Sequence, residues 1–211
     1  METKKKPYFE NCYIMQSDDI KKFADTLADG FSRYNLFEYV CNGEYDHRKM
    51  SLFWALSIAL NADNAICIAD SKEINSVIVY IRPGSKEPGP ISYMRLGGLN
   101  LFRIGLKSLM RLLSFDTKAQ AIAKNHKKAG DGYLMAFATR LDKQRMHYGK
   151  PLMQALLDYL DATGEGCYLE TLKPENVGLY ERYGFELKES VKIQSGNLTL
   201  FAMRRNAKSA K

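Results

Sequence analysis

The sequence predicts an α/β (α+β) fold: a mixed, mostly antiparallel twisted sheet of six to seven strands, flanked by helices on both faces. Two observations support this prediction. In the second half of the chain, short apolar runs typical of strands alternate with segments whose apolar residues recur at helical spacing. Around residues 65–81 and 185–205, pairs of strand-like runs are joined by short polar turns, as in β-hairpins. Strands, helices and hairpins in this order imply one sheet covered by helices.

Length and composition favour one folded domain. The chain has 211 residues, of which 45% are hydrophobic and 26% charged, so we expect a single domain over residues 1–211. No apolar run approaches the ~18 residues that a membrane span needs, which argues against an integral membrane protein. The N-terminal charges are not followed by an apolar segment, so a secretory signal is not expected. These features favour a cytoplasmic protein.

The first half of the chain predicts a strand, two helices and a hairpin. We expect a first strand over residues 9–16 and a helix from Ser17-Asp18-Asp19 to about residue 32, with the serine hydroxyl as its cap and the acids facing the helix dipole. A second helix is expected over 47–61 because its apolar residues recur at helical spacing. The runs 65–69 and 77–81 are expected to form the hairpin.

A helical insertion is expected before the fourth strand. Glycine and proline residues between 82 and 90 indicate a loop, and the following segment, 95–129, is expected to form two helices. In the first of these helices Arg103, Lys107 and Arg111 recur at four-residue intervals on one side, opposite the apolar residues. A basic amphipathic helix can lie on an anionic membrane surface, or it can pack on a sheet with its charged face in water; we favour packing. The apolar side is expected to contain Leu101, Ile104, Leu109, Leu112 and Leu113.

The pattern is clearest after residue 131. Pro151 falls in the first turn of a helix there, where its missing N–H removes no helical hydrogen bond. Gly184 is a natural left-handed cap for another helix. The expected elements are strand 132–139, a helix with an apolar stripe over 152–160, strand 167–172, helix 174–183, and strands 185–194 and 198–205.

Metal and nucleic-acid chemistry are not expected. The four cysteines and three histidines have no ligand-like spacing, so we expect no metal site and read the cysteines as small apolar residues in a reducing compartment. The formal net charge is +7, but much of the excess lies near the two ends of the chain. Such charges usually solvate frayed ends, so we expect no nucleic-acid partner. The C-terminal charges are Arg204, Arg205, Lys208 and Lys211.

A first candidate motif lies between a strand and a helix. It reads Gln144-Arg145-Met146-His147-Tyr148-Gly149 and is followed by Lys150 and an apolar helix. The unpaired N–H groups and partial positive charge of a helix N-terminus bind phosphate. Gly149 allows close approach of the backbone to a ligand, and the basic side chains add positive charge.

A second candidate motif joins strand 167–172 to the helix after it. Leu169-Glu170-Thr171 is followed by Asn176 and Tyr180, and then by Gly184-Phe185. Residues four positions apart share one face of a helix, so the amide of Asn176 and the phenol of Tyr180 are expected side by side. Their expected place is just beyond the C-terminal end of the strand.

Together these two segments, within residues 132–187, resemble the GNAT superfamily of N-acetyltransferases, which use acetyl-CoA. The second segment matches the family pattern Leu-Glu-Thr, Asn-x-x-x-Tyr, Gly-Phe closely. The first segment is similar to the family's pyrophosphate loop, Gln/Arg-x-x-Gly-x-Gly/Ala, but His147 stands where the first glycine is expected. A histidine fits there with a negative φ, or with a tolerated left-handed conformation.

The resemblance implies specific site residues. Asn176 would contact the cofactor arm, and Tyr180 would protonate the departing thiolate. Glu170 is the first candidate for the base that accepts the amine proton; alternatively it orients a water or pairs with a surface lysine. The backbone of Phe137, Ala138 and Thr139 would pair with the pantetheine arm and stabilise the oxyanion. The pyrophosphate would be bound by the backbone amides of Gln144, Arg145, Met146, His147, Tyr148, Gly149 and Lys150.

The expected function is that of an acyl-CoA-dependent N-acyltransferase. The resemblance implies transfer of acetyl from acetyl-CoA to a primary amine of a small molecule or peptide, by direct attack and without a metal. Residues 17–131 would form the acceptor side and 132–205 the acetyl-CoA-binding core, in a monomer or homodimer. One alternative is a catalytically silent acyl-CoA-binding or regulatory module on the same fold. Another is a basic protein that associates with nucleic acid or membranes through the 99–113 helix and its termini.

Overall fold

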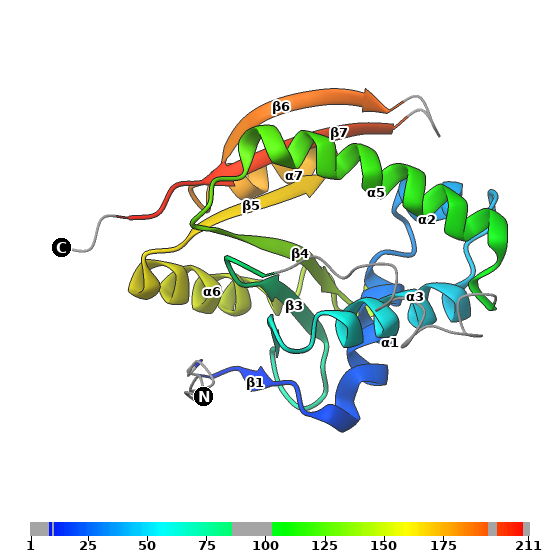
Figure 1. The fold of residues 1–211 in the computed structure, drawn as a ribbon. Coiled ribbons are helices and arrows are strands. Elements are labelled where there is room, and N and C mark those ends of the chain that lie inside the picture. Colours follow the sequence, from blue (N-terminus) through cyan, green and yellow to red (C-terminus); the bar gives the residue numbers. More distant parts are fainter. Residues whose placement is uncertain (1–8, 10, 86–102, 194–197, 209–211) are drawn as a thin grey trace.

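The strands of the chain form one open sheet with helices on both sides (Figure 1). The structure, a computed structural model, describes residues 9, 11–85, 103–193 and 198–208. The sheet has seven strands in the order β1-β2-β3-β4-β5-β7-β6, which confirms the predicted mixed α/β fold. The strands are β1 (Tyr13–Ile14), β2 (Ala65–Ala69), β3 (Ser76–Ile81), β4 (Asp131–Thr139), β5 (Gly166–Thr171), β6 (Glu186–Ile193) and β7 (Leu198–Arg205).

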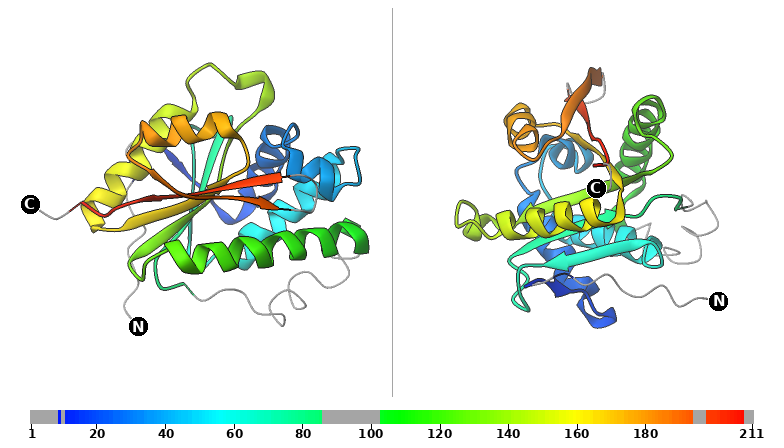
Figure 2. Two further views of the ribbon diagram at one scale, coloured as in Figure 1. Left: turned by 90° about the horizontal axis from the view of Figure 1, so that it is seen from above. Right: turned by 90° about the vertical axis from the view of Figure 1, so that its left-hand side faces the viewer.

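The helices divide between the two faces of the sheet (Figure 2). Side chains alternate between faces along a strand, so Val77 and Val79 of β3 pack on one side and Ile78 and Tyr80 on the other. The first face is covered by α1 (Ile20–Gly30), α2 (Asn35–Val40), α3 (His47–Leu60) and α5 (Leu106–His126). The second face is covered by α6 (Gly149–Thr163) and α7 (Pro174–Glu181).

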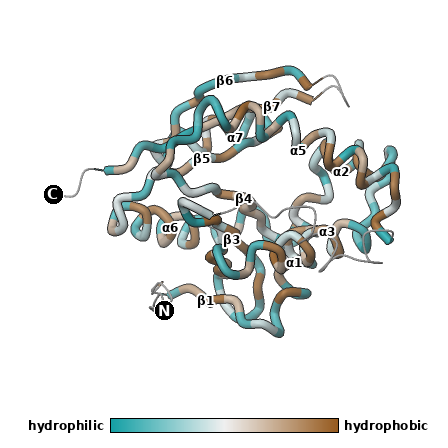
Figure 3. Tube along the Cα trace, viewed as in Figure 1, coloured by the Kyte–Doolittle hydropathy of each residue, from teal (hydrophilic) through white to brown (hydrophobic). Residues whose placement is uncertain are grey.

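The amphipathic patterns that predicted the helices correspond to this packing. Hydrophobic and hydrophilic positions alternate along α6 and α1 in the hydropathy view (Figure 3). The predicted apolar stripe of α6, from Leu152 to Leu160, is buried against the sheet. Among the helices of the described residues, none has the combined length and hydropathy of a membrane span.

The N-terminal predictions are partly wrong. The first strand is confined to Tyr13–Ile14, which pair with β2, rather than covering 9–16. Ser17 does not cap α1; the chain forms a short 3₁₀ turn over Ser17–Asp19 instead. Asp19 is the N-cap residue of α1, without a side-chain cap hydrogen bond to that helix. Its carboxylate instead accepts hydrogen bonds from the backbone nitrogen of Gln16 (3.0 Å) and the hydroxyl of Tyr13 (2.5 Å). Helix α2 was not predicted from the sequence.

Helix α5 packs on the sheet, as expected, but its boundaries differ from the prediction. Gly105, with a φ of +92°, precedes a continuous helix over Leu106–His126, so Ile104 and Leu109 do not share one helix. The part of the predicted pair over 95–102 lies outside the described residues. Leu112 is buried, but Leu113 is 47% exposed and faces away from the core.

Two C-terminal arginines are buried, which corrects the expectation of a solvated end. Arg204 is 6% exposed and forms a bidentate pair with Asp131, with Nε–Oδ2 and Nη2–Oδ1 distances of 2.6 and 2.9 Å. Arg205 is 5% exposed and pairs with Asp161, which also binds exposed Lys208. Strand β7 lies inside the sheet, between β5 and β6, and this position buries its charged end.

Candidate active site

Strands β4 and β5 separate after three paired residues. They run parallel and pair only at Asp131↔Gly166, Gly132↔Cys167 and Tyr133↔Tyr168, whereas every other neighbouring pair in the sheet is antiparallel. Beyond this point β4 stays paired with β3 up to Thr139, and β5 stays paired with β7 up to Thr171. The side of β4 that faces β5 is therefore open over its last residues, including Phe137, Ala138 and Thr139 (Figure 1).

The loop between β4 and α6 has an unusual backbone. After a 3₁₀ turn over Leu141–Lys143, Arg145 and His147 both adopt left-handed conformations with a φ of +65°. Of the two conformations that the sequence left open, a negative φ and a left-handed one, His147 thus adopts the left-handed one. This conformation strains a residue with a side chain and favours glycine. The chain enters α6 at Gly149, two residues after His147.

Gly149 makes a close contact within the protein. A Cβ at this position would lie 2.7 Å from Cζ of the Phe137 ring. Glycine therefore allows the first turn of α6 to lie against the end of β4. This contact brings the N-terminus of α6 and the open edge of β4 together.

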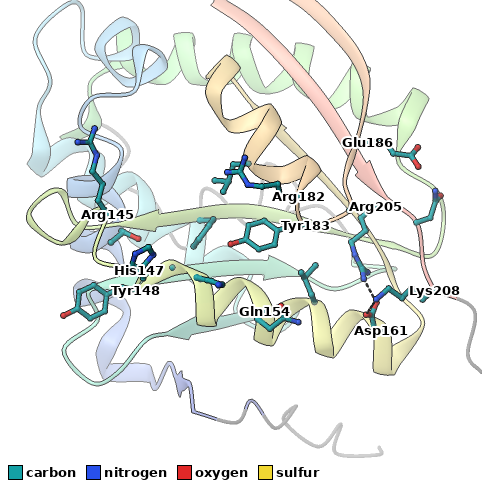
Figure 4. A pocket seen from close by; sticks show the side chains of 18 of the residues that line it. Arg145, His147, Tyr148, Gln154, Asp161, Arg182, Tyr183, Glu186, Arg205 and Lys208 are labelled. Carbon is teal, nitrogen blue, oxygen red and sulfur yellow. Dashed lines mark hydrogen bonds and ion pairs between the residues drawn. The ribbon is translucent and has the colours of Figure 1, made fainter.

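A cleft of about 1050 Å³ runs from this loop along α6, between α6 and the end of α7 (Figure 4). Seven of the predicted site residues line it: Phe137, Thr139, Arg145, His147, Tyr148, Gly149 and Lys150. The remaining lining residues are Lys143, Gln154, Leu157, Asp161, Leu179, Arg182, Tyr183, Gly184, Glu186, Arg205, Asn206, Ala207 and Lys208. Ala138, Gln144 and Met146 lie in the same strand and loop but do not line the cleft.

The cleft carries excess positive charge. Arg145, Lys150 and Arg182 have no acidic partner within the described part of the chain, while Arg205 and Lys208 share Asp161. Arg182 was not among the predicted site residues. Arg182 lies between Tyr180 and Gly184 of the second motif. Only the packing of α7 beside α6 brings it to the same cleft as the loop between β4 and α6. This arrangement can bind a ligand with several negative charges.

Tyr180 is buried and does not line the cleft. It is 8% exposed, belongs to the core between α6, α7 and the sheet, and packs edge-to-face on Phe185 with ring centroids 5.7 Å apart. Burial raises the pKa of its hydroxyl above the usual value, so the group retains its proton near neutral pH.

Asn176, one turn before Tyr180, is held at the end of β5. Its Nδ2 donates a hydrogen bond of 3.1 Å to Oγ1 of Thr171. The same threonine oxygen is 3.0 Å from the hydroxyl of Tyr34, which comes from the connection between α1 and α2. The expected proximity of Asn176 to the strand end is therefore present, and Tyr34 is an additional residue there.

Glu170 faces the other side of the sheet from Tyr180. Because side chains alternate along β5, Glu170 shares the α5 side with Tyr168, and its Oε2 accepts a hydrogen bond of 2.7 Å from the hydroxyl of Tyr133. Burial raises the pKa of this carboxyl group from 4.5 to about 7, an effect that the charge of Asp116 reinforces and the hydrogen bond from Tyr133 opposes. A carboxyl group in this state can exchange a proton near neutral pH.

Comparisons with known proteins give a family match and similar solved structures. Residues 113–185 match the model of the acetyltransferase (GNAT) family. A histone acetyltransferase HPA2 and related acetyltransferase from Corynebacterium glutamicum is similar in structure, with a TM-score of 0.67 and 20% identity over 95% of this chain and 98% of that chain. A mosquito arylalkylamine N-acetyltransferase like 5b has a TM-score of 0.58 and 11% identity, over 92% and 98%.

A third similar structure is a condensation domain. The C-terminal condensation domain of Ebony, in complex with beta-alanyl-dopamine, has a TM-score of 0.64 and 8% identity over 93% of this chain and 98% of that chain. None of the curated proteins matches the chain. These similarities show the fold, and together with the family match over residues 113–185 they confirm the resemblance to GNAT acetyltransferases.

Within the described residues, no group of three or more histidine, cysteine, aspartate or glutamate side chains is arranged to hold a metal ion.

Proposed function

We propose that the chain is an N-acetyltransferase that transfers the acetyl group of acetyl-CoA to a primary amine of a small molecule or peptide. The observation that carries this proposal is the separation of β4 from β5 directly beside the N-terminus of α6. An open strand edge offers hydrogen bonds to an extended amide-containing arm, and a helix N-terminus offers them to phosphate.

The residues present fit coenzyme A. Its diphosphate would be held by the backbone of Gln144–Lys150 with the unpaired cations Arg145 and Lys150, and Arg182 is available for a further phosphate. The backbone of Phe137–Thr139 and the side chain of Asn176 would hold the arm. A cleft of about 1050 Å³ is large enough for such a ligand. When bound, acetyl-CoA supplies an activated acyl group as a thioester.

Three parts of the chain would then divide the chemistry. Glu170, with its pKa near 7, accepts a proton from the acceptor ammonium and so provides the neutral amine. Backbone N–H groups at the end of β4 stabilise negative charge on the carbonyl oxygen as the N–C bond forms. Tyr180 donates its proton to the sulfur as the C–S bond breaks, a role consistent with its retained proton. Alignment of two bound substrates supplies much of the acceleration.

The positions of Tyr180 and Glu170 suggest from which face of the sheet each substrate enters. Tyr180 lies on the α6 and α7 side, where the cleft opens, and Glu170 lies on the side covered by α1 and α5. The donor would therefore enter from the cleft and the acceptor from the opposite face. Aromatic side chains that gather there include Phe31, Tyr34 and Trp54.

Calorimetry with coenzyme A, followed by measurement of thiol release from acetyl-CoA with a panel of amines, tests the proposal. We expect binding and amine-dependent release. Binding without release for any amine would favour the alternative of a silent acyl-CoA-binding module. Absence of binding at millimolar coenzyme A would overturn both.

A further inference from the structure

Tyr34 lies where the corner between α1 and α2 meets the two diverging strands. Its hydroxyl oxygen accepts a hydrogen bond of 2.6 Å from the backbone nitrogen of Leu172, just beyond β5. The same corner also touches the end of β4, since a Cβ at Gly30 would lie 2.7 Å from the carbonyl oxygen of Thr139. The corner therefore spans the ends of both strands on the face opposite the cleft.

The hydrogen bonds around the hydroxyl groups of Tyr34 and Thr171 leave one hydroxyl proton without an acceptor. Oγ1 of Thr171 accepts from Nδ2 of Asn176 (3.1 Å) and from the backbone nitrogen of Lys173 (3.3 Å). A hydroxyl oxygen accepts two hydrogen bonds and donates one, so the Thr171 proton goes to Tyr34, at 3.0 Å. The Tyr34 oxygen then accepts from both Thr171 and Leu172. Its own proton has no acceptor among the residues that the structure describes.

An unused donor at this position points to a ligand. Burial raises the pKa of Tyr34, and the nearby charges of Glu175 and Glu170 raise it further, so the hydroxyl stays protonated near neutral pH. Leaving a donor without an acceptor in a mostly buried place is unfavourable, because the donor has lost its hydrogen bonds to water. Tyr34 also bonds to the same threonine as Asn176, the side chain expected to contact the arm of the acyl donor.

We infer that the Tyr34 hydroxyl donates a hydrogen bond to the carbonyl oxygen of the acyl group on the bound thioester, an assignment that rests on the proposed function. This oxygen is the acceptor that must lie between the separated strand ends when the acyl group is attacked. Tyr34 would approach it from the end of β5, while the backbone of β4 approaches it from the other strand. The hydrogen bond would become stronger as charge develops on the oxygen.

The substitution Tyr34→Phe separates this role from general binding. Coenzyme A lacks the acyl carbonyl, whereas a ketone analogue of acetyl-CoA, with a methylene in place of the sulfur, retains it. We expect calorimetry on Tyr34→Phe to give an unchanged Kd for coenzyme A and a Kd for the ketone analogue that is about threefold to tenfold weaker. We also expect kcat to fall about 100-fold.

Tyr39→Phe is the matched control, because Tyr39 lies in α2 nearby and packs against Arg111 through its ring. We expect it to leave both affinities and kcat unchanged. Equal weakening of coenzyme A and the ketone by Tyr34→Phe would overturn the inference, because the hydroxyl would then hold the arm or the fold. Unchanged ketone affinity, with normal coenzyme A binding, would overturn this inference alone. Failure of the wild type to bind coenzyme A would overturn the proposed function as well.

Discussion

The hydroxyl of Tyr133 donates a hydrogen bond of 2.7 Å to Oε2 of Glu170, across the point where β4 and β5 begin to diverge. Tyr133 is the last residue of β4 that pairs with β5, and its partner is Tyr168. Glu170 lies two residues after Tyr168 in β5. The carboxylate is thus fixed at the beginning of the opening between the strands. Its surroundings are buried, and this burial is the main reason for its raised pKa.

Glu170→Gln tests the base. Because the pKa of Glu170 is about 7, the carboxyl group is protonated and inactive as a base below this pH and becomes ionised above it. We expect kcat/KM of the wild type to rise with pH through about 7, and the variant to lose this limb with a fall in kcat of about 100-fold. A pH profile at saturating acetyl-CoA provides the measurement. Retention of the same limb in the variant would assign it to another group.

Tyr180→Phe tests the acid. The variant keeps the ring that packs on Phe185 but removes the proton that would reach the leaving sulfur. We expect kcat to fall about 100-fold, with little change in the Kd of coenzyme A. Tyr183→Phe, on the wall of the cleft, is a useful comparison because its hydroxyl has no assigned catalytic role. Full activity of Tyr180→Phe would refute the role of acid.

His147→Gly tests the strain in the loop. A left-handed φ of +65° costs a residue with a side chain roughly 1–2 kcal/mol, and glycine gives back roughly 0.5–1 kcal/mol through its freer unfolded chain. We expect the free energy of unfolding to increase by about 0.5–1 kcal/mol in denaturant titrations. His147→Ala retains the strain and should show no such gain. We expect unchanged coenzyme A affinity for both variants, so weaker binding in both would identify the imidazole as a ligand contact.

Asp131→Asn tests the buried ion pair. Asp131 is 2% exposed and holds both the guanidinium of Arg204 and the backbone nitrogen of Lys128. Loss of its charge leaves a buried guanidinium uncompensated, so we expect a loss of about 3–5 kcal/mol of unfolding free energy. The exposed pair of Asp142 with Arg140 provides the contrast. Asp142→Asn should change stability by less than about 1 kcal/mol, and similar losses in both variants would contradict this explanation.

Much of the fold could be predicted from the sequence because its signals are local. Apolar spacing located α3 and α6, apolar runs and turns located the β2–β3 hairpin, and Gly184 marked the end of α7 with a φ of +84°. The N-terminal strand was overestimated because an apolar run does not show how many residues find a partner. The length of β1 is set by its pairing with only two residues of β2.

The sequence by itself determined the two motifs, the alternation of strands and helices, and hence the class of cofactor to test. It also located Glu170 and Tyr180, and the family resemblance implied a role for each. Only the tertiary structure decided that these side chains lie on opposite faces of the sheet and that β4 and β5 separate beside α6. It also brought Tyr34 to Thr171 and Arg182 to the cleft. The physical reason is that spacing along the chain reports one element's own periodicity, whereas burial, pKa and hydrogen-bond satisfaction depend on residues far away in sequence.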